Sequence, residues 1–376
     1  MRSPLSLQLA VEIAASGGVL RFDRFMELAL YEPRLGYYEK LATNPGRRGD
    51  YFTSVSVGPV FGELLAFQFS RRFDDLASPR SEPLRLVEAG AHDGQLAADI
   101  LSWIREWRPD LLERMRYTLV EPSPLRLARQ RARLADFSGQ VDWWSAIQPF
   151  SGILFANELL DAFPIRRFGW NRPQRRWFEW GVASHAMEPF FAWAQLPGAL
   201  DSPVGSLPDA VLNCIPDGFV LEHSHAAEVW WRTAANALNQ GWLVTADYGA
   251  RLDLPLDPDR PEGTLRGYRE HRVTRQVLEH PGEQDLTAHV DFHRLRQAGE
   301  ASGLQTTSLE TQERWLNRIF AETTAAADRF ATWTPTRVRQ FQTLTHPGHL
   351  GRAFSVLVQQ RSVESESMIP TSPPIE

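Results

Sequence analysis

A glycine turn at residues 90–94, which follows the acid Glu88, has residues whose types and spacing could do chemistry. The run LRLVEAG (84–90) is apolar, ends in an acid and a small-residue turn, and continues through G-A-H-D-G into a helical pattern. A strand, a glycine turn and a helix in this order hold nucleotide-like ligands, because backbone N–H groups at the helix start face the ligand. The candidate contacts are Glu88, Gly90, Asp93 and Gly94.

The turn lacks the middle glycine of the dinucleotide motif G-x-G-x-x-G, because Ala91 and His92 occupy that part of the loop. A pyrophosphate needs the close backbone approach that glycine allows, so the turn favours a ligand without one and disfavours a nicotinamide oxidoreductase. S-adenosylmethionine is such a ligand, made of adenine, ribose, a sulfonium and an amino-acid tail. The carboxylates of Glu88 and Asp93 suit its positive end.

Glu121 ends the next predicted strand, 116–122. An acid in this place can accept hydrogen bonds from both hydroxyls of a ribose. The alternative is that Glu121 caps the helix predicted from Pro124, since acids stabilise helix N-termini. With the glycine turn one strand earlier, the ribose interpretation is favoured.

The string ANELLDAFP places Asn157, Glu158 and Asp161 at a predicted strand-to-helix junction within 152–164. On a helix, Glu158 and Asp161 would share a face, because they are three residues apart. Two carboxylates at the mouth of a cofactor pocket suit a guanidinium, which they bind through charge-assisted bonds and from which they can take a proton. The alternative is that these residues cap the helix N-terminus.

Two further strand ends add polar residues. Asp142 and Trp143 lie in the predicted strand 141–144, and Asp247 lies near the end of the strand 241–249. Ligands of an open parallel sheet bind at the carboxyl ends of its strands, so these side chains join the candidate site. The histidine pairs His289/His293 and His223/His225 belong to no H-E-x-x-H motif, and we expect structural histidines and no metal site.

Strands and helices alternate over most of the chain, which predicts a mostly parallel α/β sheet with helices on both faces. The segment 165–196 breaks this alternation with antiparallel strands, which predicts an inserted sheet. The predicted helices are 60–76, 95–107, 124–135, 226–239 and 290–304, and a late strand is predicted at 353–360. Helical apolar spacing also runs through 5–30.

The composition excludes several classes of protein. The chain has 376 residues, a net charge of −6 and a pI near 6.0, so no basic field points to nucleic acid. Cys214 is the only cysteine, which excludes a disulfide framework, and Lys40 is the only lysine, which excludes a phosphate loop. No apolar run is long enough for a membrane helix. We therefore expect a soluble, cytoplasmic protein.

Taken together, these motifs resemble the MidA family of S-adenosylmethionine-dependent methyltransferases. Mitochondrial members of that family are complex I assembly factors that methylate an arginine of a complex I subunit. The resemblance covers almost the whole chain, and its most specific strings are FMELALYEPRLGYY (25–38), GDYFTS (49–54), ANELLDAFPIRRF (156–168), GTLRGY (263–268) and PGEQDLTAHVDF (281–292). The chain departs from the family's G-P-G-x-G loop at Ala91 and His92, and from its TSPEIS string, which is TSVSVG here.

The resemblance implies a role for each candidate residue. Residues 88–94 would contact the methionine part of the cofactor, Glu121 the ribose, and Asp142 with Trp143 the adenine. An N-terminal loop would close over the cofactor with Gly49, Asp50, Thr53 and Ser54. Asn157, Glu158 and Asp161 would face the methyl acceptor, and the inserted strands with the segment 263–292 would bind it.

We therefore expect an S-adenosylmethionine-dependent methyltransferase with a Rossmann-like class I sheet, whose substrate is a protein carrying an arginine, such as a respiratory-complex subunit. Neither nucleic-acid binding nor membrane insertion is expected. The alternative is a non-catalytic assembly or binding protein on the same fold. The expected parts are an N-terminal helical and cofactor-lid region (1–80), the core (81–165 and 218–362), an inserted acceptor-binding subdomain (166–217) and a disordered tail (363–376).

Overall fold

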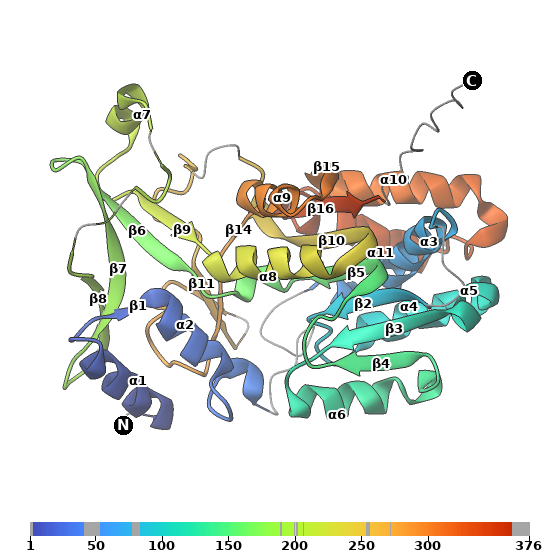
Figure 1. The fold of residues 1–376 in the computed structure, drawn as a ribbon, viewed down its shortest axis with the longest axis horizontal. Helices are drawn as coiled ribbons and strands as arrows, with labels where there is room; N and C mark the ends of the chain where they lie inside the picture. Colours follow the sequence, from blue (N-terminus) through green and yellow to red (C-terminus); the bar gives the residue numbers. More distant parts are fainter. Residues whose placement is uncertain are drawn as a thin grey trace, which may run out of the picture.

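An eight-stranded sheet forms the centre of the larger part of the molecule (Figure 1). The structure, a computed structural model, describes residues 3–40, 53–76, 83–188, 190–198, 200, 202–205, 207–252, 256–270 and 272–362. The strands of this central sheet are β2 (Leu84–Ala89), β3 (Met115–Val120), β4 (Val141–Trp144), β5 (Phe150–Asn157), β10 (Leu238–Ala250), β14 (Val290–Asp291), β15 (Gln305–Thr311) and β16 (Phe354–Arg361). Their order is β15-β16-β10-β5-β2-β3-β4, and β14 pairs with β10.

Most neighbouring strands of the central sheet run parallel, as the alternation of strands and helices predicts. The strands β2, β3, β4, β5 and β10 form parallel pairs. β16 runs antiparallel to β10, and β15 runs antiparallel to β16, so β16 is reversed within the sheet. The chain continues from β2 to β3 and β4 on one side and then crosses to β5 on the other. The ends of β2 and β5 therefore flank a topological switch point, where such sheets bind ligands.

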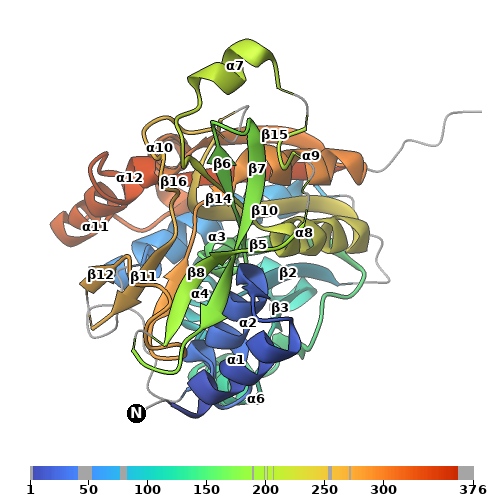
Figure 2. The same cartoon turned by 90° about the vertical axis from the view of Figure 1, so that its left-hand side faces the viewer.

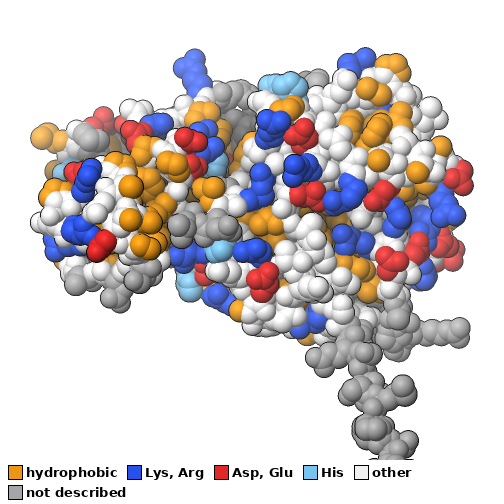
Figure 3. All heavy atoms as spheres, turned by 90° about the horizontal axis from the view of Figure 1, so that it is seen from above, with side chains coloured by type: hydrophobic (Ala, Val, Ile, Leu, Met, Phe, Trp, Pro, Cys, Tyr) orange, Lys and Arg blue, Asp and Glu red, His pale blue; other side chains and the backbone are white. Residues whose placement is uncertain are grey.

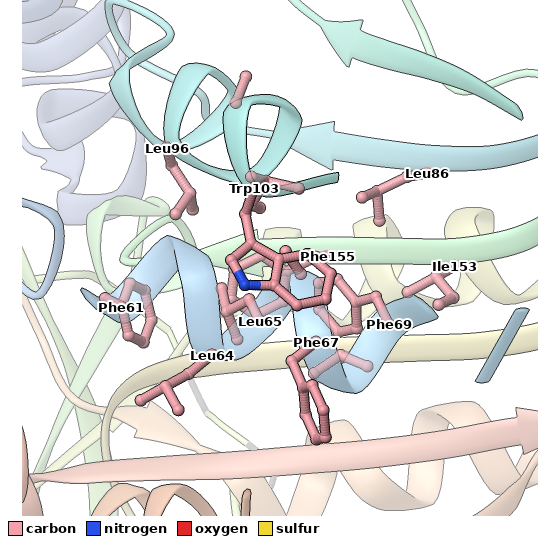
Figure 4. Packing of buried hydrophobic residues seen from close by; sticks show 14 of the residues in the cluster. Phe61, Leu64, Leu65, Phe67, Phe69, Leu86, Leu96, Trp103, Ile153 and Phe155 are labelled. Atoms are coloured by element: carbon pink, nitrogen blue, oxygen red, sulfur yellow. The ribbon is translucent and has the colours of Figure 1, made fainter. Parts of the chain in front are cut away.

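Helices cover both faces of the central sheet, which explains why its strands are nearly continuous apolar runs. Along β5, Ile153 and Phe155 belong to one buried cluster and Leu154 to another, because successive side chains point to opposite faces. In Figure 4, side chains of α3 gather around Trp103 and Phe155, and the ring centroids of Phe69 and Phe155 lie 5.5 Å apart. One face packs against α3 (Val60–Asp74), α4 (Gln95–Trp107) and α10 (Gln312–Ala325), and the other against α8 (His225–Ala237) and α9 (Phe292–Ala301).

A second lobe, made of two smaller sheets and the first two helices, lies beside the central sheet in Figure 1 and faces the viewer in Figure 2. Its larger sheet has the order β1-β7-β6-β9, with β8 paired to β7, and its smaller sheet has the order β12-β11-β13. The elements of this second lobe are α1 (Pro4–Ala15), α2 (Phe22–Tyr31), β1 (Leu20–Arg21), β6 (Arg166–Asn171), β7 (Arg176–Ser184), β8 (Phe191–Gln195), β9 (Val220–His223), β11 (Arg266–Arg269), β12 (Arg272–Thr274) and β13 (Asp285–Thr287).

The second lobe extends beyond the insertion expected at 166–217. β1 and β9 lie outside that range but pair with β7 and β6, because the edge strands of the inserted sheet need partners for their backbone groups. The expected N-terminal region 1–80 also divides between the two parts of the molecule. α1 and α2 bury their apolar faces in the second lobe, whereas α3 packs on the central sheet. The expected tail, 363–376, lies outside the described residues.

The helical apolar spacing predicted in 5–30 forms two helices, which Gly17 and Gly18 separate with left-handed φ angles of 78° and 97°. The sequence analysis did not predict α10, and it left several shorter elements unassigned. The remaining described elements are α5 (Pro109–Arg114), α6 (Pro124–Arg133), α7 (Asp209–Cys214), α11 (Pro335–Thr345), α12 (Leu350–Ala353) and the 3₁₀ turns η1 (Tyr37–Glu39), η2 (Val55–Val57), η3 (Ala135–Phe137), η4 (Leu160–Ala162) and η5 (Ala327–Arg329).

Acidic and basic side chains are interspersed on the face of the molecule seen in Figure 3, and no single sign dominates it. Within the ranges that the structure describes, every helix is too short or too polar to cross a membrane.

Glycines allow the central strands β2, β5 and β10 to approach closely where they begin. A Cβ atom on Gly241 would lie 1.8 Å from the carbonyl oxygen of Gly152, and the φ angle of Gly241 is 118°. We expect Gly241→Ala to lower the free energy of unfolding by about 2–4 kcal/mol, because it combines a backbone clash with a strained φ. Urea denaturation followed by circular dichroism measures the change.

Gly139→Ala is the matched control, because a Cβ atom there meets nothing within 4 Å. It should change the free energy of unfolding by less than about 0.5 kcal/mol. Equal effects of the two substitutions would contradict the close approach of β5 and β10.

Candidate active site

A cavity of about 260 Å³ opens at the carboxyl ends of β2 and β5, beside the switch point of the central sheet. Three segments form its wall: the residues before and within η2, the turn after β2, and the end of β5. The cavity is lined by Thr53, Val55, Ser56, Glu88, Gly90, Ala91, His92, Asp93, Gln95, Leu96, Asn157 and Glu158. The structure therefore brings together residues that the sequence analysis predicted from three separate motifs.

The turn after β2 uses left-handed backbone conformations at Gly90, His92 and Gly94, with φ angles of 77°, 47° and 84°. The Gly94 N–H donates to the Ala91 carbonyl at 2.7 Å, which closes the turn just before α4. A Cβ atom on Gly90 would lie 2.9 Å from Leu159 Cδ1, so a larger residue would crowd the end of β5. His92 keeps the left-handed conformation of the turn although it is not a glycine, and the backbone remains in the shape of a ligand loop.

Gln130 holds this turn to the two neighbouring strands. The side-chain amide donates to the His92 carbonyl and to Glu121 Oε2, both at 2.9 Å, and accepts from Trp143 Nε1 at 3.1 Å. Gln130 is fully buried on α6. The sequence analysis missed this residue, and the only signal was a glutamine within an arginine-rich helix. One amide thus fixes the ends of β2, β3 and β4 relative to one another.

Glu121 lies behind the turn and outside the residues that line the cavity. Its Oε1 accepts from the Ser123 N–H at 2.9 Å, at the N-terminus of α6, so it also makes the kind of contact that the capping alternative predicted. Burial raises the pKa of Glu121, and the nearby Arg126 works against that rise. Each carboxylate oxygen keeps one further lone pair, and the contact with a ribose stays a prediction.

The two predicted adenine residues lie further from the cavity. Asp142 is partly exposed and pairs with Arg85 at 2.9 Å, so its carboxylate is already engaged. Trp143 donates to Gln130, which binds the turn after β2. Gly49 and Asp50, predicted to close over the cofactor, lie outside the described residues, and the contact of Asp142 with adenine stays a prediction.

Two acids of the cavity differ in their protonation. Tyr117 donates to Glu88 Oε2 at 2.6 Å, but burial dominates and raises the pKa of Glu88 to about 7. Burial also raises the pKa of Asp93, but His92 and Arg133 outweigh it and hold that pKa at about 2. Asp93 therefore carries a full negative charge at neutral pH. Glu88 is partly protonated there, and a bound cation would favour its charged form.

Glu158 also lines the cavity, directly after the end of β5. Its Oε1 accepts from the Ser54 N–H and from Asn157 Nδ2, both at 2.9 Å. Burial raises the pKa of Glu158 to about 8. Asn157 Oδ1 is buried and has no hydrogen-bond partner within the described ranges, so it can accept a bond from a ligand. The backbone of Ser54, next to Thr53, thus binds Glu158, a contact that the sequence analysis did not predict, and the closure of this loop over the cofactor stays a prediction.

The predicted helix after β5 is wrong. Glu158 has a φ angle of 51°, and only one 3₁₀ turn follows, because Pro164 cannot continue a helix and pushes the residue before it to an extended conformation. Glu158 and Asp161 therefore do not share a helix face. No α-helix begins directly after β5 in the described ranges, so Asn157, Glu158 and Asp161 do not cap one.

Asp247 shapes the turn that replaces this helix. Its Oδ2 accepts from the N–H groups of Leu159, Leu160 and Asp161, at 3.1, 2.8 and 3.3 Å. Burial raises the pKa of Asp247 to about 7 although these bonds lower it. Burial and the neighbouring carboxylates of Asp247, Asp285 and Glu158 raise the pKa of Asp161 well above its usual range. The result is a cluster of buried carboxylates next to the cavity, with Asp161 outside the cavity wall.

One of the two histidine pairs lies close to an acid in the described ranges, and arginines surround that group. His289 precedes α9, and its Nε2 lies 2.8 Å from Arg260 Nη1. His223, His225 and Glu228 bring one ligand atom each within 4.8 Å of one another. Glu228 also lies 3.6 Å from Arg232 and 3.8 Å from Arg294, and these positive charges oppose a cation.

The pKa of Glu158 makes stability depend on pH. Its carboxyl titrates near 4.5 in the unfolded chain and near 8 in the folded one, so between these values the folded chain holds the extra proton. The free energy of unfolding should therefore fall as pH rises through that window. In Glu158→Gln this fall should be smaller by at least about 1 kcal/mol, measured by urea denaturation from pH 5 to 8. The exposed Glu113→Gln is the control, and an unchanged slope in Glu158→Gln would refute the buried proton.

Comparisons with known proteins agree with this geometry. The family model described as "Putative S-adenosyl-L-methionine-dependent methyltransferase" matches residues 64–309. The protein arginine methyltransferase NDUFAF7, mitochondrial, of Danio rerio is 30% identical over 312 residues, which are 77% of this chain and 70% of that protein. The homolog of Drosophila melanogaster is 28% identical over 329 residues, 80% of this chain and 70% of that protein.

A solved structure extends the similarity to the fold and the cofactor. A protein of Burkholderia thailandensis crystallised with S-adenosyl-homocysteine is 29% identical, with a TM-score of 0.78, and the match covers 96% of this chain and 95% of that one. The cavity described above fits S-adenosylmethionine, because the lining acids Glu88 and Asp93 suit its positive groups and the buried Asn157 Oδ1 has no hydrogen-bond partner within the described ranges.

Proposed function

Since this chain belongs to this family of S-adenosyl-L-methionine-dependent methyltransferases, we propose that its methyl acceptor is an arginine guanidinium of a partner protein. The named relatives are protein arginine methyltransferases, which supports this acceptor. The altered loop at Ala91 and His92 favours the non-catalytic alternative, but the chain's membership in a family of enzymes supports the methyltransferase.

The observation that carries the proposal is the cluster of buried carboxylates beside the cavity. Burial raises the pKa values of Glu158, Asp161 and Asp247, and the charge of Asp247 raises those of Glu158 and Asp161 further. Asp285, from β13 of the second lobe, adds its charge to Asp161. A guanidinium keeps its positive charge and offers five N–H donors, so it is the side chain that best relieves such a cluster.

The cofactor supplies a methyl group that is already activated by its sulfonium. The chain's own residues then have to hold the acceptor nitrogen and take its proton. Asn157 and Ser54 both bind Oε1 of Glu158, which orients the carboxylate and leaves Oε2 to receive that proton. A pKa of about 8 makes Glu158 a base matched to neutral pH once the acceptor's charge is bound beside it.

For the cofactor itself we propose contacts at the turn after β2 and at Glu121. Glu88, Gly90, Asp93 and Gly94 would hold the amino-acid part, and Glu121 would accept the ribose hydroxyls. Thr53 and Ser54 would close the cavity, with Asp142 and Trp143 toward the adenine. A respiratory-complex subunit as the protein substrate and a cytoplasmic location both stay predictions, and the named relatives are mitochondrial.

Glu121→Gln tests the ribose contact while keeping the shape of the side chain. We expect it to weaken S-adenosylmethionine binding by about 100-fold, because two hydrogen bonds to a charged carboxylate contribute about 1.5 kcal/mol each. Titration calorimetry measures the affinity, thermal unfolding verifies the fold, and the exposed Glu113→Gln serves as the control. Unchanged affinity in a folded Glu121→Gln protein would exclude the ribose contact.

Methyl transfer to arginine can be measured directly with labelled cofactor and arginine-containing proteins, followed by acid hydrolysis and identification of the labelled amino acid. We expect methylarginine as the labelled product. We expect Glu158→Gln to lower kcat by at least about 100-fold, because the loss of a general base slows an enzyme by about that factor or more. Cofactor affinity, measured in parallel, should change by less than about threefold. Label on lysine or on a carboxylate instead would contradict the proposal.

A further inference from the structure

His92 is the only basic residue among those that line the cavity in the described part of the chain. The other ionisable residues in the same wall are the acids Glu88, Asp93 and Glu158. His92 also occupies a left-handed backbone position, with a φ angle of 47°, in a turn whose other left-handed residues are glycines. The backbone conformation at this position favours glycine, so the shape of the turn does not require the imidazole.

The backbone that carries the imidazole is held in place, but one ring nitrogen has no hydrogen-bond partner in the described part of the chain. The side chain of Gln130 binds the His92 carbonyl at 2.9 Å, which fixes the backbone of the turn. The Nδ1 atom of His92 is buried and makes no hydrogen bond within the described ranges. The nearest acid, Asp93, keeps its Oδ1 3.9 Å from that atom, too far for a hydrogen bond, and directs Oδ2 to Arg133 at 2.6 Å. A buried ring nitrogen in this state costs free energy unless a ligand satisfies it.

The charges of the cofactor supply the missing partner. S-adenosylmethionine carries a sulfonium, an ammonium and a carboxylate on its amino-acid part. Glu88 and Asp93 suit the two positive groups, but they would repel the carboxylate. We propose that the His92 imidazole donates a hydrogen bond to the α-carboxylate of the cofactor and thereby selects ligands with an intact amino-acid end.

A thermodynamic cycle that varies both the side chain at position 92 and the carboxylate of the ligand tests this contact. Wild type, His92→Gly and His92→Asn are titrated by calorimetry with S-adenosylmethionine and with its decarboxylated analogue, which differs only at the carboxylate. We expect His92→Gly to weaken the carboxylate-bearing ligand by about tenfold and the analogue by less than about twofold. His92→Asn, which tolerates the left-handed backbone and keeps a donor, should show a smaller loss.

Val55→Ala is the matched control, because it shortens an apolar side chain of the same wall and should affect both ligands equally. Thermal unfolding of each variant verifies that the protein is folded. Equal weakening of both ligands by His92→Gly would overturn the proposal, and so would tighter binding of both, which would show that the imidazole obstructs the cavity. The test measures binding alone, so its outcome does not depend on whether the acceptor is an arginine.

Discussion

One buried carboxylate, that of Asp247, determines the geometry on which the whole site depends. It lies near the end of β10 and accepts N–H groups from Leu159, Leu160 and Asp161 in the turn after β5, together with that of Tyr248. Asp247 thus satisfies backbone N–H groups that have no helical partner. The chain can therefore turn sharply at Glu158. Glu158 consequently faces the cavity, whereas Asp161 faces the second lobe. The cofactor side and the acceptor side of the site thus meet at a single turn.

The second lobe contributes to the same site through its tyrosines. The Tyr38 hydroxyl donates to Asp285 Oδ1 at 2.7 Å, and the Tyr31 hydroxyl donates to the Ala162 carbonyl at 2.9 Å. The N-terminal segment is therefore bonded both to an acid of β13 and to the turn that Asp247 shapes. These contacts bring negative groups from two parts of the molecule close together, although burial penalises each of them. Such an arrangement is costly for a scaffold and useful for a site that receives a cation.

Sequence reasoning recovered the parallel core because each central strand is a short apolar run followed by a helical pattern. It failed after β5, where the apolar periodicity of ANELLDAFP looks helical but Pro164 and the bonds to Asp247 prevent a helix. It also missed Gln130, because a side-chain amide that joins three strand ends leaves no local signal. Residues identified by motif, such as Glu88 and Glu158, were found together in one wall. Their partners, which come from distant segments, could not be found from the sequence.

The second lobe combines segments that lie far apart in the sequence, and this constrains the order in which the chain can fold. Leu5, Leu9 and Phe25 of the first two helices pack in one cluster with Val182 and Leu286. During synthesis from the N-terminus, the apolar faces of α1 and α2 therefore have no complete partner until well over half of the chain has been made. Contacts of such long sequence separation form slowly and leave hydrophobic surface exposed meanwhile. The helices α1 and α2 are made before the segments that cover them, so they are among the last elements to be buried, and their apolar faces stay exposed in the interval.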